Sequence, residues 1–383
     1  VEIIENNETT IIETNDPFVE LKKLLGKSND QKYRYLGGAV GVVNYDSIRL
    51  VENISKENNL SQPIMEFGIY DDGLLYDNVE KKLFYFYHDV NRFDELIVSD
   101  DSFDEFNSSE VTPNMDKEKF SSIVNKAKQY IHDGDIFQVV LSRKFAFDTS
   151  GDNLTLYKTL RKLNPSPYMY HLKQDSKTII GASPEMLVRI TDDKVETFPI
   201  AGTRKITDNE EKNKALSEEL IHDEKELAEH TMLVDLGRND IGRVCKYGTV
   251  HPESLMQIKR FSHVQHIVSH VVGNLDSKND MFDAFQAVFP AGTVSGAPKV
   301  RAMQIINELE GEERGPYAGA VGYFSYNGCC DFAIAIRSIF IENNKGFVQS
   351  GAGIVSDSVA ENEFKETEHK AGAMLQALKE ASK

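Results

Sequence analysis

The feature that most constrains the fold is a long succession of short strand patterns joined by turns. Apolar or alternating runs predict strands at residues 136–147, 168–172, 178–181, 186–190, 194–198, 255–275, 317–326 and 331–341. The last two flank Asn327-Gly328, a dipeptide typical of tight hairpins. These runs do not alternate regularly with helices, as the strands of a parallel sheet would. The sequence therefore predicts an α+β fold, with large antiparallel β-sheets packed face to face and helices on their outer faces.

Helical periodicity appears between these runs. Asp116, a residue type favoured at the start of a helix, precedes apolar residues at helical spacing, and similar patterns occur at 17–25, 154–163, 281–289 and 298–309. The charged stretch at residues 208–233 predicts one long helix. The small residues Gly351-Ala352-Gly353 predict a turn that leads into a final helix.

Length and a polar interval predict two domains. The chain has 383 residues, more than a single core usually serves. Its first part predicts a hairpin, a buried strand at 37–43 and strands within 64–87 that turn at Asp72-Gly73, whereas 91–114 is polar and acidic. We predict an N-terminal, regulatory-type domain at 1–112 and a catalytic domain at 113–383. Val1 lies inside a strand pattern, so we expect that part of the natural N-terminus is absent.

Charge and cysteine content exclude several classes of function. The net charge of −18 argues against a nucleic-acid partner, because phosphate binding needs clustered Lys and Arg. No apolar run approaches the length of a membrane span, and no signal-peptide pattern is present. Cys245, Cys329 and Cys330 have neither disulfide-framework nor metal-binding spacing, which predicts a cytoplasmic location.

Two glutamate pairs at a spacing of three residues are candidate metal ligands. Glu226 with Glu229, and Glu363 with Glu366, would each share a helix face. Two such helices side by side would surround one point with four carboxylates, a set that suits Mg²⁺. On spacing alone, a solvated helix surface is the more frequent explanation. Glu366 and His369 also match the Glu-x-x-His unit of di-iron bundles, but that site needs four long helices.

Arg337 is the most unusual single charge in the sequence. It falls inside an apolar predicted strand, where a charge is costly unless it faces a carboxylate or a ligand. Small residues before predicted helices, as at residues 200–203 and 351–353, can expose N–H groups to an anion. Residues 290–299 resemble a phosphate loop but lack the lysine that a P-loop needs after its glycine.

Four longer motifs resemble the signature blocks of the chorismate-utilising enzymes, most closely those of the anthranilate-forming branch. They are Pro-Ile-Ala-Gly-Thr at 199–203, Glu-His-Thr-Met-Leu-Val-Asp-Leu-Gly-Arg-Asn-Asp at 229–240, Phe-Pro-Ala-Gly-Thr-Val-Ser-Gly-Ala-Pro-Lys at 289–299, and residues 351–370. The similarity runs in register from about residue 116 to the end and is weaker over residues 1–110. Four long motifs in one order are far more specific than a glutamate spacing, so the resemblance favours the metal site over the solvated surface.

The resemblance implies a Mg²⁺ site and a chorismate site. Glu229 and Glu366 would bind the ion directly and Glu226 and Glu363 through water, while the ion holds the ring carboxylate of chorismate. The implied substrate-binding residues are Gly202, Thr203, Tyr317, Arg337, Gly351, Ala352, Gly353 and Lys370.

The resemblance also implies the catalytic groups. Glu185 matches the general acid that would protonate the departing C4 hydroxyl, a role that needs a raised pKa. His266 matches a histidine that would handle a proton during pyruvate elimination, although a hydrogen-bonded strand histidine is an ordinary alternative. Thr293 would contact the substrate.

Two positions separate the branches of the family. Ala201 stands where aminodeoxychorismate synthases that use a covalent intermediate carry lysine. Gln138 stands where isochorismate and salicylate synthases carry the lysine that activates water. Both positions favour direct addition of ammonia at C2, followed by loss of pyruvate to give anthranilate. The alternatives are an aminodeoxychorismate synthase component, and a module that binds chorismate or tryptophan without turnover.

Regulation and partners follow from the same resemblance. Pro167, Tyr168 and Met169 resemble the segment that contacts the feedback effector tryptophan, whereas a Leu-Leu-Glu-Ser motif expected near the N-terminus does not occur. The resemblance therefore leaves tryptophan inhibition open. None of the three cysteines lies in a nucleophile elbow, so ammonia is expected from a separate glutamine amidotransferase subunit, in a hetero-oligomer.

Overall fold

A computed structural model describes residues 1–5, 8–50, 52, 54, 60–97, 104–261 and 264–383. The strands are β1 Glu2–Glu5, β2 Glu8–Ile11, β3 Gly38–Val43, β4 Met65–Tyr70, β5 Asp72–Asp77, β6 Lys82–Tyr87, β7 Phe106–Ser108, β8 Thr112–Pro113, β9 Gln138–Gly151, β10 Tyr168–Gln174, β11 Lys177–Ser183, β12 Met186–Thr191, β13 Lys194–Thr197, β14 Ile200–Lys205, β15 His251–Arg260, β16 Val264–Asn274, β17 Gly296–Ala297, β18 Ala320–Ser325, β19 Cys330–Ile334, β20 Ser338–Glu342 and β21 Lys345–Ile354. The helices are α1 Pro17–Leu24, α2 Lys117–His132, α3 Asn153–Leu163, α4 Glu210–His222, α5 Glu224–Gly242, α6 Met281–Val288, α7 Lys299–Glu310 and α8 Ala360–Ala381, with short 3₁₀ turns η1 Tyr45–Leu50, η2 Phe93–Glu95 and η3 Gly292–Val294.

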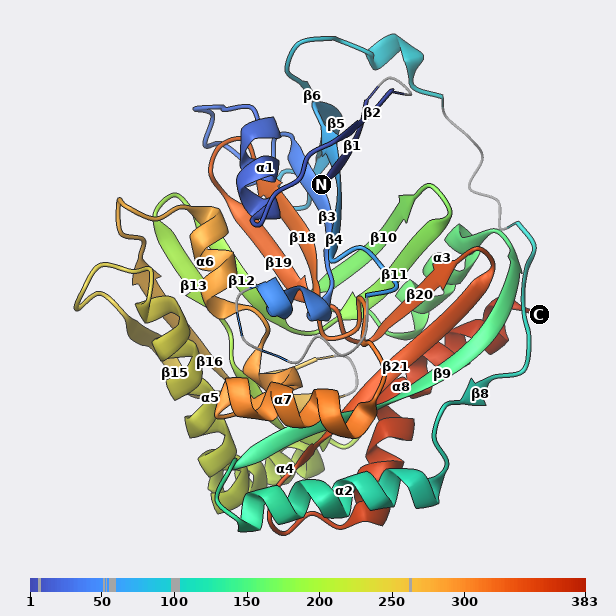
Figure 1. Cartoon of the computed structure of the whole chain (residues 1–383), viewed down its shortest axis with the longest axis vertical. Helices are drawn as coiled ribbons and strands as arrows, with labels where there is room; N and C mark the ends of the chain where they lie inside the picture. Colours follow the sequence, from blue (N-terminus) through green and yellow to red (C-terminus); the bar gives the residue numbers. More distant parts are fainter. Residues whose placement is uncertain (6–7, 51, 53, 55–59, 98–103, 262–263) are drawn as a thin grey trace.

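Two large sheets form the centre of the molecule (Figure 1). One has eight strands in the order β10-β11-β20-β21-β9-β17, with β7 and β8 also on β9. The other has nine strands in the order β14-β16-β13-β12-β19-β18-β3-β4, with β15 also on β16. Every pairing between named strands that the structure describes is antiparallel. The predicted α+β fold with large antiparallel sheets is confirmed.

Three apolar clusters hold these layers together. The largest joins residues of both sheets with α6, and its centre is a group of aromatic rings: Phe285 lies 4.7 Å from Phe332 and 5.6 Å from Phe324 between ring centroids. A second cluster packs α3 and α8 against the eight-stranded sheet. A third packs α2 and α7 around β9 and β21. Because such rings bury large apolar areas, the first cluster fixes how the two sheets face each other.

The chain passes from one sheet to the other at two neighbouring places. It leaves β11 and enters β12 through residues 184–185, and it leaves β19 and enters β20 through residues 335–337. The two passages are joined, since the Ile334 N–H donates to the Glu185 carbonyl at 3.1 Å. The prediction of one strand over 331–341 is therefore wrong. Arg337 lies in the break, with a φ of 51°, because the two flanking strands belong to different sheets.

Three further predictions need correction. The helix predicted over residues 208–233 is two helices, because Asp223 ends α4 and its side chain caps α5. Asp72-Gly73 opens β5 and is not a turn, and the chain turns instead at residues 78–81. Gly351-Ala352-Gly353 lies within β21, paired with β9, and is not a turn before α8.

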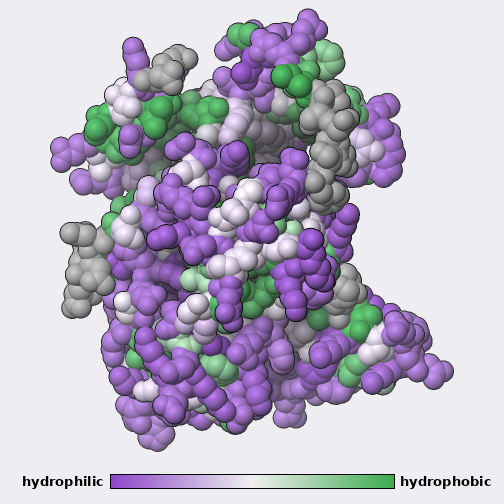
Figure 2. Space-filling view, turned by 90° about the vertical axis from the view of Figure 1, so that its right-hand side faces the viewer, coloured by the Kyte–Doolittle hydropathy of each residue, from purple (hydrophilic) through white to green (hydrophobic). Residues whose placement is uncertain are grey.

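The N-terminal part shares its sheet with the rest of the chain. Strand β3 pairs with both β4 and β18, and Phe18 of α1 packs on Phe282 and Phe285 of α6. The division into 1–112 and 113–383 remains a prediction. No helix among the described residues is long and apolar enough to cross a membrane. The face drawn in Figure 2 is mostly hydrophilic, with hydrophobic side chains in small patches.

Candidate active site

Glu185 lies where the first passage between the sheets reaches β12. Its side chain is 8% exposed, and Thr293 Oγ1 donates to its Oε1 at 2.9 Å. Burial raises the pKa of Glu185 to about 8, although the Thr293 hydrogen bond and the charge of Lys370 act in the opposite direction. A cavity of about 40 Å³ borders Glu185 and Thr293, enough for one or two water molecules. Glu185 can therefore hold a proton at neutral pH.

Arg337 lies in the second passage and faces the end of β21. It donates to the Lys370 carbonyl at 2.5 Å, while Lys370 Nζ donates to the Gly351 carbonyl at 2.9 Å. Burial lowers the pKa of Arg337, whereas nearby Tyr317 and Glu366 raise it. A partly buried guanidinium that forms no ion pair with a carboxylate among the described residues is suited to an anionic ligand. The structure thus brings together residues that the sequence placed in one substrate site.

The amides of Gly351 and Gly353 point away from β9. Their partners in the ladder are Ser142 and Val140, whose N–H groups donate to Glu310 and to the Ser295 carbonyl. Such residues form non-hydrogen-bonded pairs, in which the backbone groups of both partners face outwards. Ala352 lies between them, so its backbone N–H and C=O point towards β9. Two of the three predicted amides are therefore aimed out of the sheet.

His266 is held beside the bulge of β14. Its Nδ1 donates to the Gly202 carbonyl at 2.7 Å and lies 3.2 Å from Thr203 Oγ1. Burial lowers the pKa of His266, and the charge of Arg337 lowers it further, whereas the Gly202 hydrogen bond raises it. A neutral ring that donates through Nδ1 keeps a lone pair on Nε2, the form that accepts a proton. Gly202 has a φ of 64°, which explains why a glycine stands there.

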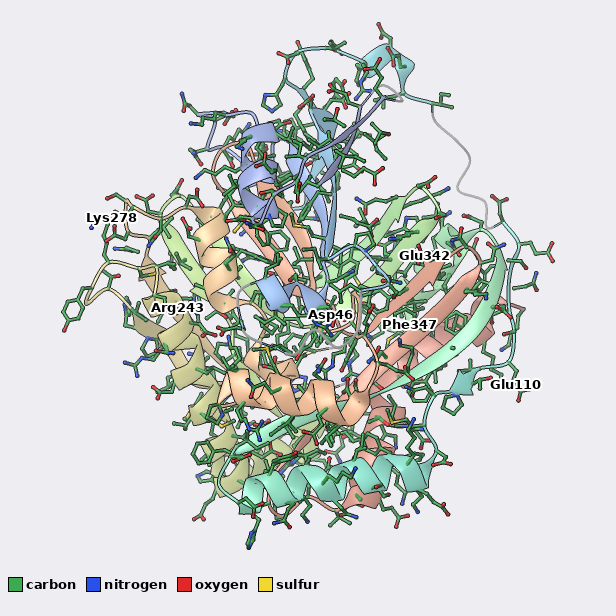
Figure 3. All side chains as sticks on the ribbon, viewed as in Figure 1. Asp46, Glu110, Arg243, Lys278, Glu342 and Phe347 are labelled. Atoms are coloured by element: carbon green, nitrogen blue, oxygen red, sulfur yellow. The ribbon has the colours of Figure 1, made fainter. Side chains whose placement is uncertain are left out.

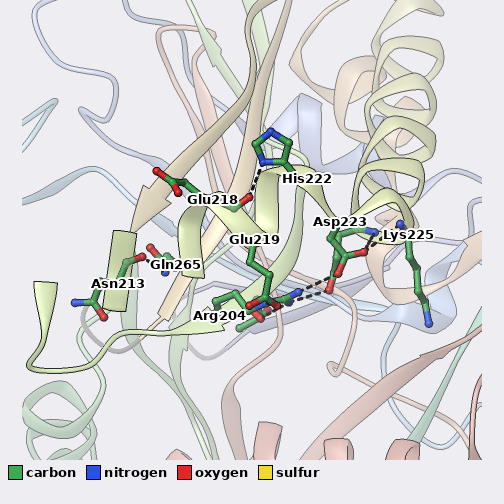
Figure 4. A network of polar contacts seen from close by, with 10 residues as sticks. Arg204, Asn213, Glu218, Glu219, His222, Asp223, Lys225 and Gln265 are labelled. Atoms are coloured by element: carbon green, nitrogen blue, oxygen red, sulfur yellow. Dashed lines mark hydrogen bonds and ion pairs between the residues drawn. The ribbon is translucent and has the colours of Figure 1, made fainter. Parts of the chain in front are cut away.

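The α5 glutamates lie between the β14 bulge and β9. Arg204 reaches Glu226 at 3.3 Å and also pairs with Glu219 and Asp223, as Figure 4 shows for the last two. Burial raises the pKa of Glu226, Arg204 lowers it and Glu229 raises it. Gln138 Nε2 donates to Glu229 Oε1 at 3.1 Å, which ties the position that separates the family branches to a predicted metal ligand.

The α8 glutamates face the same region from the other side. Glu366 pairs with Lys370 at 2.6 Å, and burial together with Glu366 raises the pKa of Glu363. Lys225 lies between the helices. Burial lowers its pKa, but the ion pair with Asp357 and the charges of Glu363 and Glu229 raise it, and the net effect is a raised pKa. The two glutamate pairs are therefore electrostatic neighbours.

The donor set matches Mg²⁺ in chemistry, whereas the carboxylates are not drawn together. Among the described residues, no group of three or more His, Cys, Asp and Glu side chains is arranged to hold a metal ion. All four glutamates are partly buried, while Glu361 and Glu368 on the same α8 are exposed. Within each pair the charge of the second glutamate helps to raise the pKa of Glu226 or Glu363, and this repulsion would be relieved by a cation beside the pair. His369 is exposed, which does not support the di-iron alternative.

Arg143 is a residue that the sequence analysis missed. It is 2% exposed, donates to the Met115 carbonyl and to Thr367 Oγ1, and lies 3.8 Å from the centroid of the Phe364 ring. Thr367 and Phe364 adjoin Glu366 and Glu363, so Arg143 fixes the part of α8 that carries both glutamates. An arginine within an apolar predicted strand was the signal that could have identified it, as at Arg337.

The predicted effector segment lies at the start of β10, where Tyr168 pairs with Ser183 at the end of β11. The Tyr168 hydroxyl donates to Asp331 Oδ1 at 2.7 Å and accepts from Arg189 at 3.1 Å. Burial raises the pKa of Tyr168. Pro167 and Met169 flank it, and a role in binding tryptophan remains a prediction.

A glutamate that keeps its proton at neutral pH, a partly buried arginine and two pairs of glutamates lie where the two antiparallel sheets part. This arrangement defines an α+β enzyme site for a small anionic substrate. Residues 2–376 match the family described as chorismate binding enzyme. The chain therefore belongs to the chorismate binding enzyme family.

Individual relatives agree with this assignment. The chain is 45% identical to an anthranilate synthase component 1 from Acetivibrio thermocellus, over 98% of this chain and 84% of the relative. A crystal structure of anthranilate synthase component I from Streptococcus pneumoniae superposes with a TM-score of 0.89 at 39% identity, covering 97% of this chain and 89% of that one. The menaquinone-specific isochorismate synthase MenF of Escherichia coli shares the fold, with a TM-score of 0.75 at 21% identity and coverage of 94% and 82%.

Proposed function

We propose that this chain is the synthase component of an anthranilate synthase, which converts chorismate and ammonia into anthranilate and pyruvate. Its relatives at about 45% identity carry that name over most of their length. Gln138 and Ala201 support the same branch, because neither side chain can act as the lysine of the sister enzymes.

The observation that carries the proposal is the position of Glu185 relative to Lys370 and Arg337, which are both partly buried. Its carboxyl holds a proton at neutral pH. The charge of Lys370 acts on Glu185, and Arg337 donates to the Lys370 backbone carbonyl, so Lys370 interacts with both residues. Arg337, with Tyr317 and the outward amides of β21, would hold the enolpyruvyl carboxylate of chorismate. Glu185 would then protonate the departing C4 hydroxyl while ammonia attacks C2.

Proton removal in the second step would fall to His266. Its Nδ1 is occupied by the Gly202 carbonyl, so Nε2 is the available acceptor. Loss of a ring proton and of the enolpyruvyl group as pyruvate would then make the ring aromatic. Thr293 would act as a positioning residue, because its hydroxyl fixes Glu185 Oε1.

We further propose Mg²⁺ as the cofactor. Glu229 and Glu366 would hold it directly, and Glu226 and Glu363 through water. When bound, the ion would neutralise the ring carboxylate of chorismate in an otherwise acidic region. Arg204 pairs with Glu226 and Lys370 pairs with Glu366. The ion would either take the place of these two positive charges or bind beside them.

A separate glutamine amidotransferase subunit would supply the ammonia in a cytoplasmic hetero-oligomer. The designation component 1 of the relatives implies a second component. The three cysteines are buried, and burial raises the pKa of Cys245 to about 11, which does not suit a glutaminase nucleophile.

The test is to incubate the purified chain with chorismate, Mg²⁺ and an ammonium salt and to follow anthranilate fluorescence. We expect anthranilate and an equal amount of pyruvate, both abolished by a chelator. Accumulation of an aminated chorismate without pyruvate would instead indicate an aminodeoxychorismate synthase. Tight chorismate binding without any product would indicate a binding module.

The metal assignment has its own test. Glu366→Gln should abolish turnover without unfolding the chain, because the amide cannot replace an anionic ligand. Glu361→Gln, at an exposed position of the same helix, is the matched control and should remain active. Equal activity of both variants would contradict the assignment.

A further inference from the structure

A cavity of about 410 Å³ lies between the two sheets and takes no part in the proposed reaction. We call it the inter-sheet cavity. It is bordered by β3 and β4 on one side and by β10, β11, β20 and β21 on the other. Its apolar walls include Val42, Leu172, Ile179, Phe340 and Phe347. This size and composition are typical of sites for small molecules.

One buried polar atom in its wall has no partner. Asn44 lines the cavity and is 3% exposed. Its Nδ2 donates to the Pro63 carbonyl at 2.6 Å, which fixes the orientation of the amide. Its Oδ1 accepts no hydrogen bond from any residue that the structure describes. Buried acceptors are rarely left unpaired, so this oxygen indicates a missing donor.

The charges around the cavity compensate one another. Lys177 pairs with Glu66 at 2.6 Å and with Glu342 at 3.6 Å, and Gln62 also donates to Glu342. Figure 3 shows Glu342 and Phe347 on the neighbouring strands β20 and β21. Lys345 is the other charged residue of the lining, so two basic and two acidic side chains balance, and the lining has no net charge that would select a charged ligand. Among the described residues that line the cavity, Asn44 Oδ1 is the buried side-chain atom left without a partner, and it requires a hydrogen-bond donor.

We propose that the inter-sheet cavity binds a small, neutral aromatic molecule that carries one hydroxyl or ring N–H donor. The ring would pack against Phe340 and Phe347, and the donor would reach Asn44 Oδ1. No residue assigned to the catalytic, metal or substrate site is among those that line the cavity, although Pro316 adjoins Tyr317. The proposal does not depend on the proposed reaction, since its test measures binding alone.

The first experiment compares two probes that differ in one donor. 2-Naphthol carries a hydroxyl, and 2-methoxynaphthalene has the same ring system without a donor. The chain contains no tryptophan, so naphthalene fluorescence can be followed directly. We expect one saturable site for 2-naphthol, binding at least about tenfold weaker for the methyl ether, and no displacement of either probe by saturating chorismate.

Two variants locate the site. Leu172→Phe should narrow the cavity and weaken binding of both probes, whereas Leu83→Phe, at an exposed position of β6, should bind both as the parent does. Asn44→Leu removes the acceptor and should abolish the preference for 2-naphthol. If Asn44→Leu does not fold, Leu172→Phe still decides the location.

Three results would overturn the proposal. They are the absence of saturable binding, equal affinity of the parent for the two probes, and displacement of 2-naphthol by chorismate. The last would place the probe in the catalytic site. None of them bears on whether the chain forms anthranilate, so the two proposals fail separately.

Discussion

Replacing Glu185 by glutamine should make the protein more stable while it abolishes activity. Burial raises the pKa of Glu185 from 4.5 to about 8. Between these values the folded chain keeps a proton that the unfolded chain releases, so the stability of the parent falls as pH rises. Each pH unit in this window is worth about 1.4 kcal/mol. At pH 7 the penalty is thus about 3 kcal/mol, and it approaches its limit near pH 8.

The measurement is the free energy of unfolding by urea for parent and Glu185→Gln at several pH values. The free energy of unfolding of the variant, relative to that of the parent, should rise by about 1.4 kcal/mol per pH unit between pH 5 and 7. This difference should become constant above the pKa of Glu185 in the folded chain. Glu211→Gln, at an exposed position of α4, controls for the loss of any one glutamate. Subtracting the value of the parent from that of the variant isolates the effect of Glu185, because both proteins contain all the other titrating groups.

The same pKa sets the pH dependence of the reaction. If Glu185 delivers a proton, kcat/KM should fall as pH rises through about 8, since the acid of the free enzyme is then ionised. A stability difference that does not change with pH would refute the raised pKa. A variant that keeps the parental rate would refute the role of Glu185 as the acid, whatever its stability.

Three further predictions concern buried groups. Arg143→Met should raise the Mg²⁺ concentration for half-maximal activity by about tenfold or more, because α8 loses the contacts that orient its glutamates; an unchanged metal titration would contradict this role. Glu310→Gln should destabilise the chain by about 3–5 kcal/mol in urea unfolding, since Arg314, 2% exposed and paired at 2.7 Å, keeps its charge without a partner; a smaller loss would mean that water reaches the guanidinium. Phe285→Ala should cost about 3–5 kcal/mol by the same measurement, because it opens a cavity at the centre of the largest core; a loss below about 1 kcal/mol would show that the neighbouring rings collapse into the space.

Local pattern predicted most elements closely. The periodicity after Asp116 corresponds to α2, for which Asp116 is the capping residue, and the runs at 168–172 and 186–190 lie within β10 and β12. These predictions succeed because side-chain alternation and capping depend on neighbours in sequence. The failures have non-local causes. Residues 351–353 contain two glycines, a pattern typical of a turn, yet pairing with β9 holds them in a strand.

The candidate site was also predicted only in part from the sequence. The resemblance in four motifs assigned the family, which the comparison confirms over residues 2–376. It also singled out Glu185 and Arg337, whose roles remain predictions. Sequence analysis could not supply their environment, because the pKa of Glu185 follows from burial and from charges on distant segments. Arg143 and the inter-sheet cavity were missed, since neither belongs to a motif.

The sequence by itself determined the strands, most of the helices and the family, because periodicity and motifs are properties of contiguous residues. Only the tertiary structure decided which strand joins which sheet. That choice broke the predicted strand at residues 335–337 and placed Arg337 in a passage between the sheets that runs beside the passage carrying Glu185. Strand partners are chosen by packing between distant segments, and no local pattern encodes that packing.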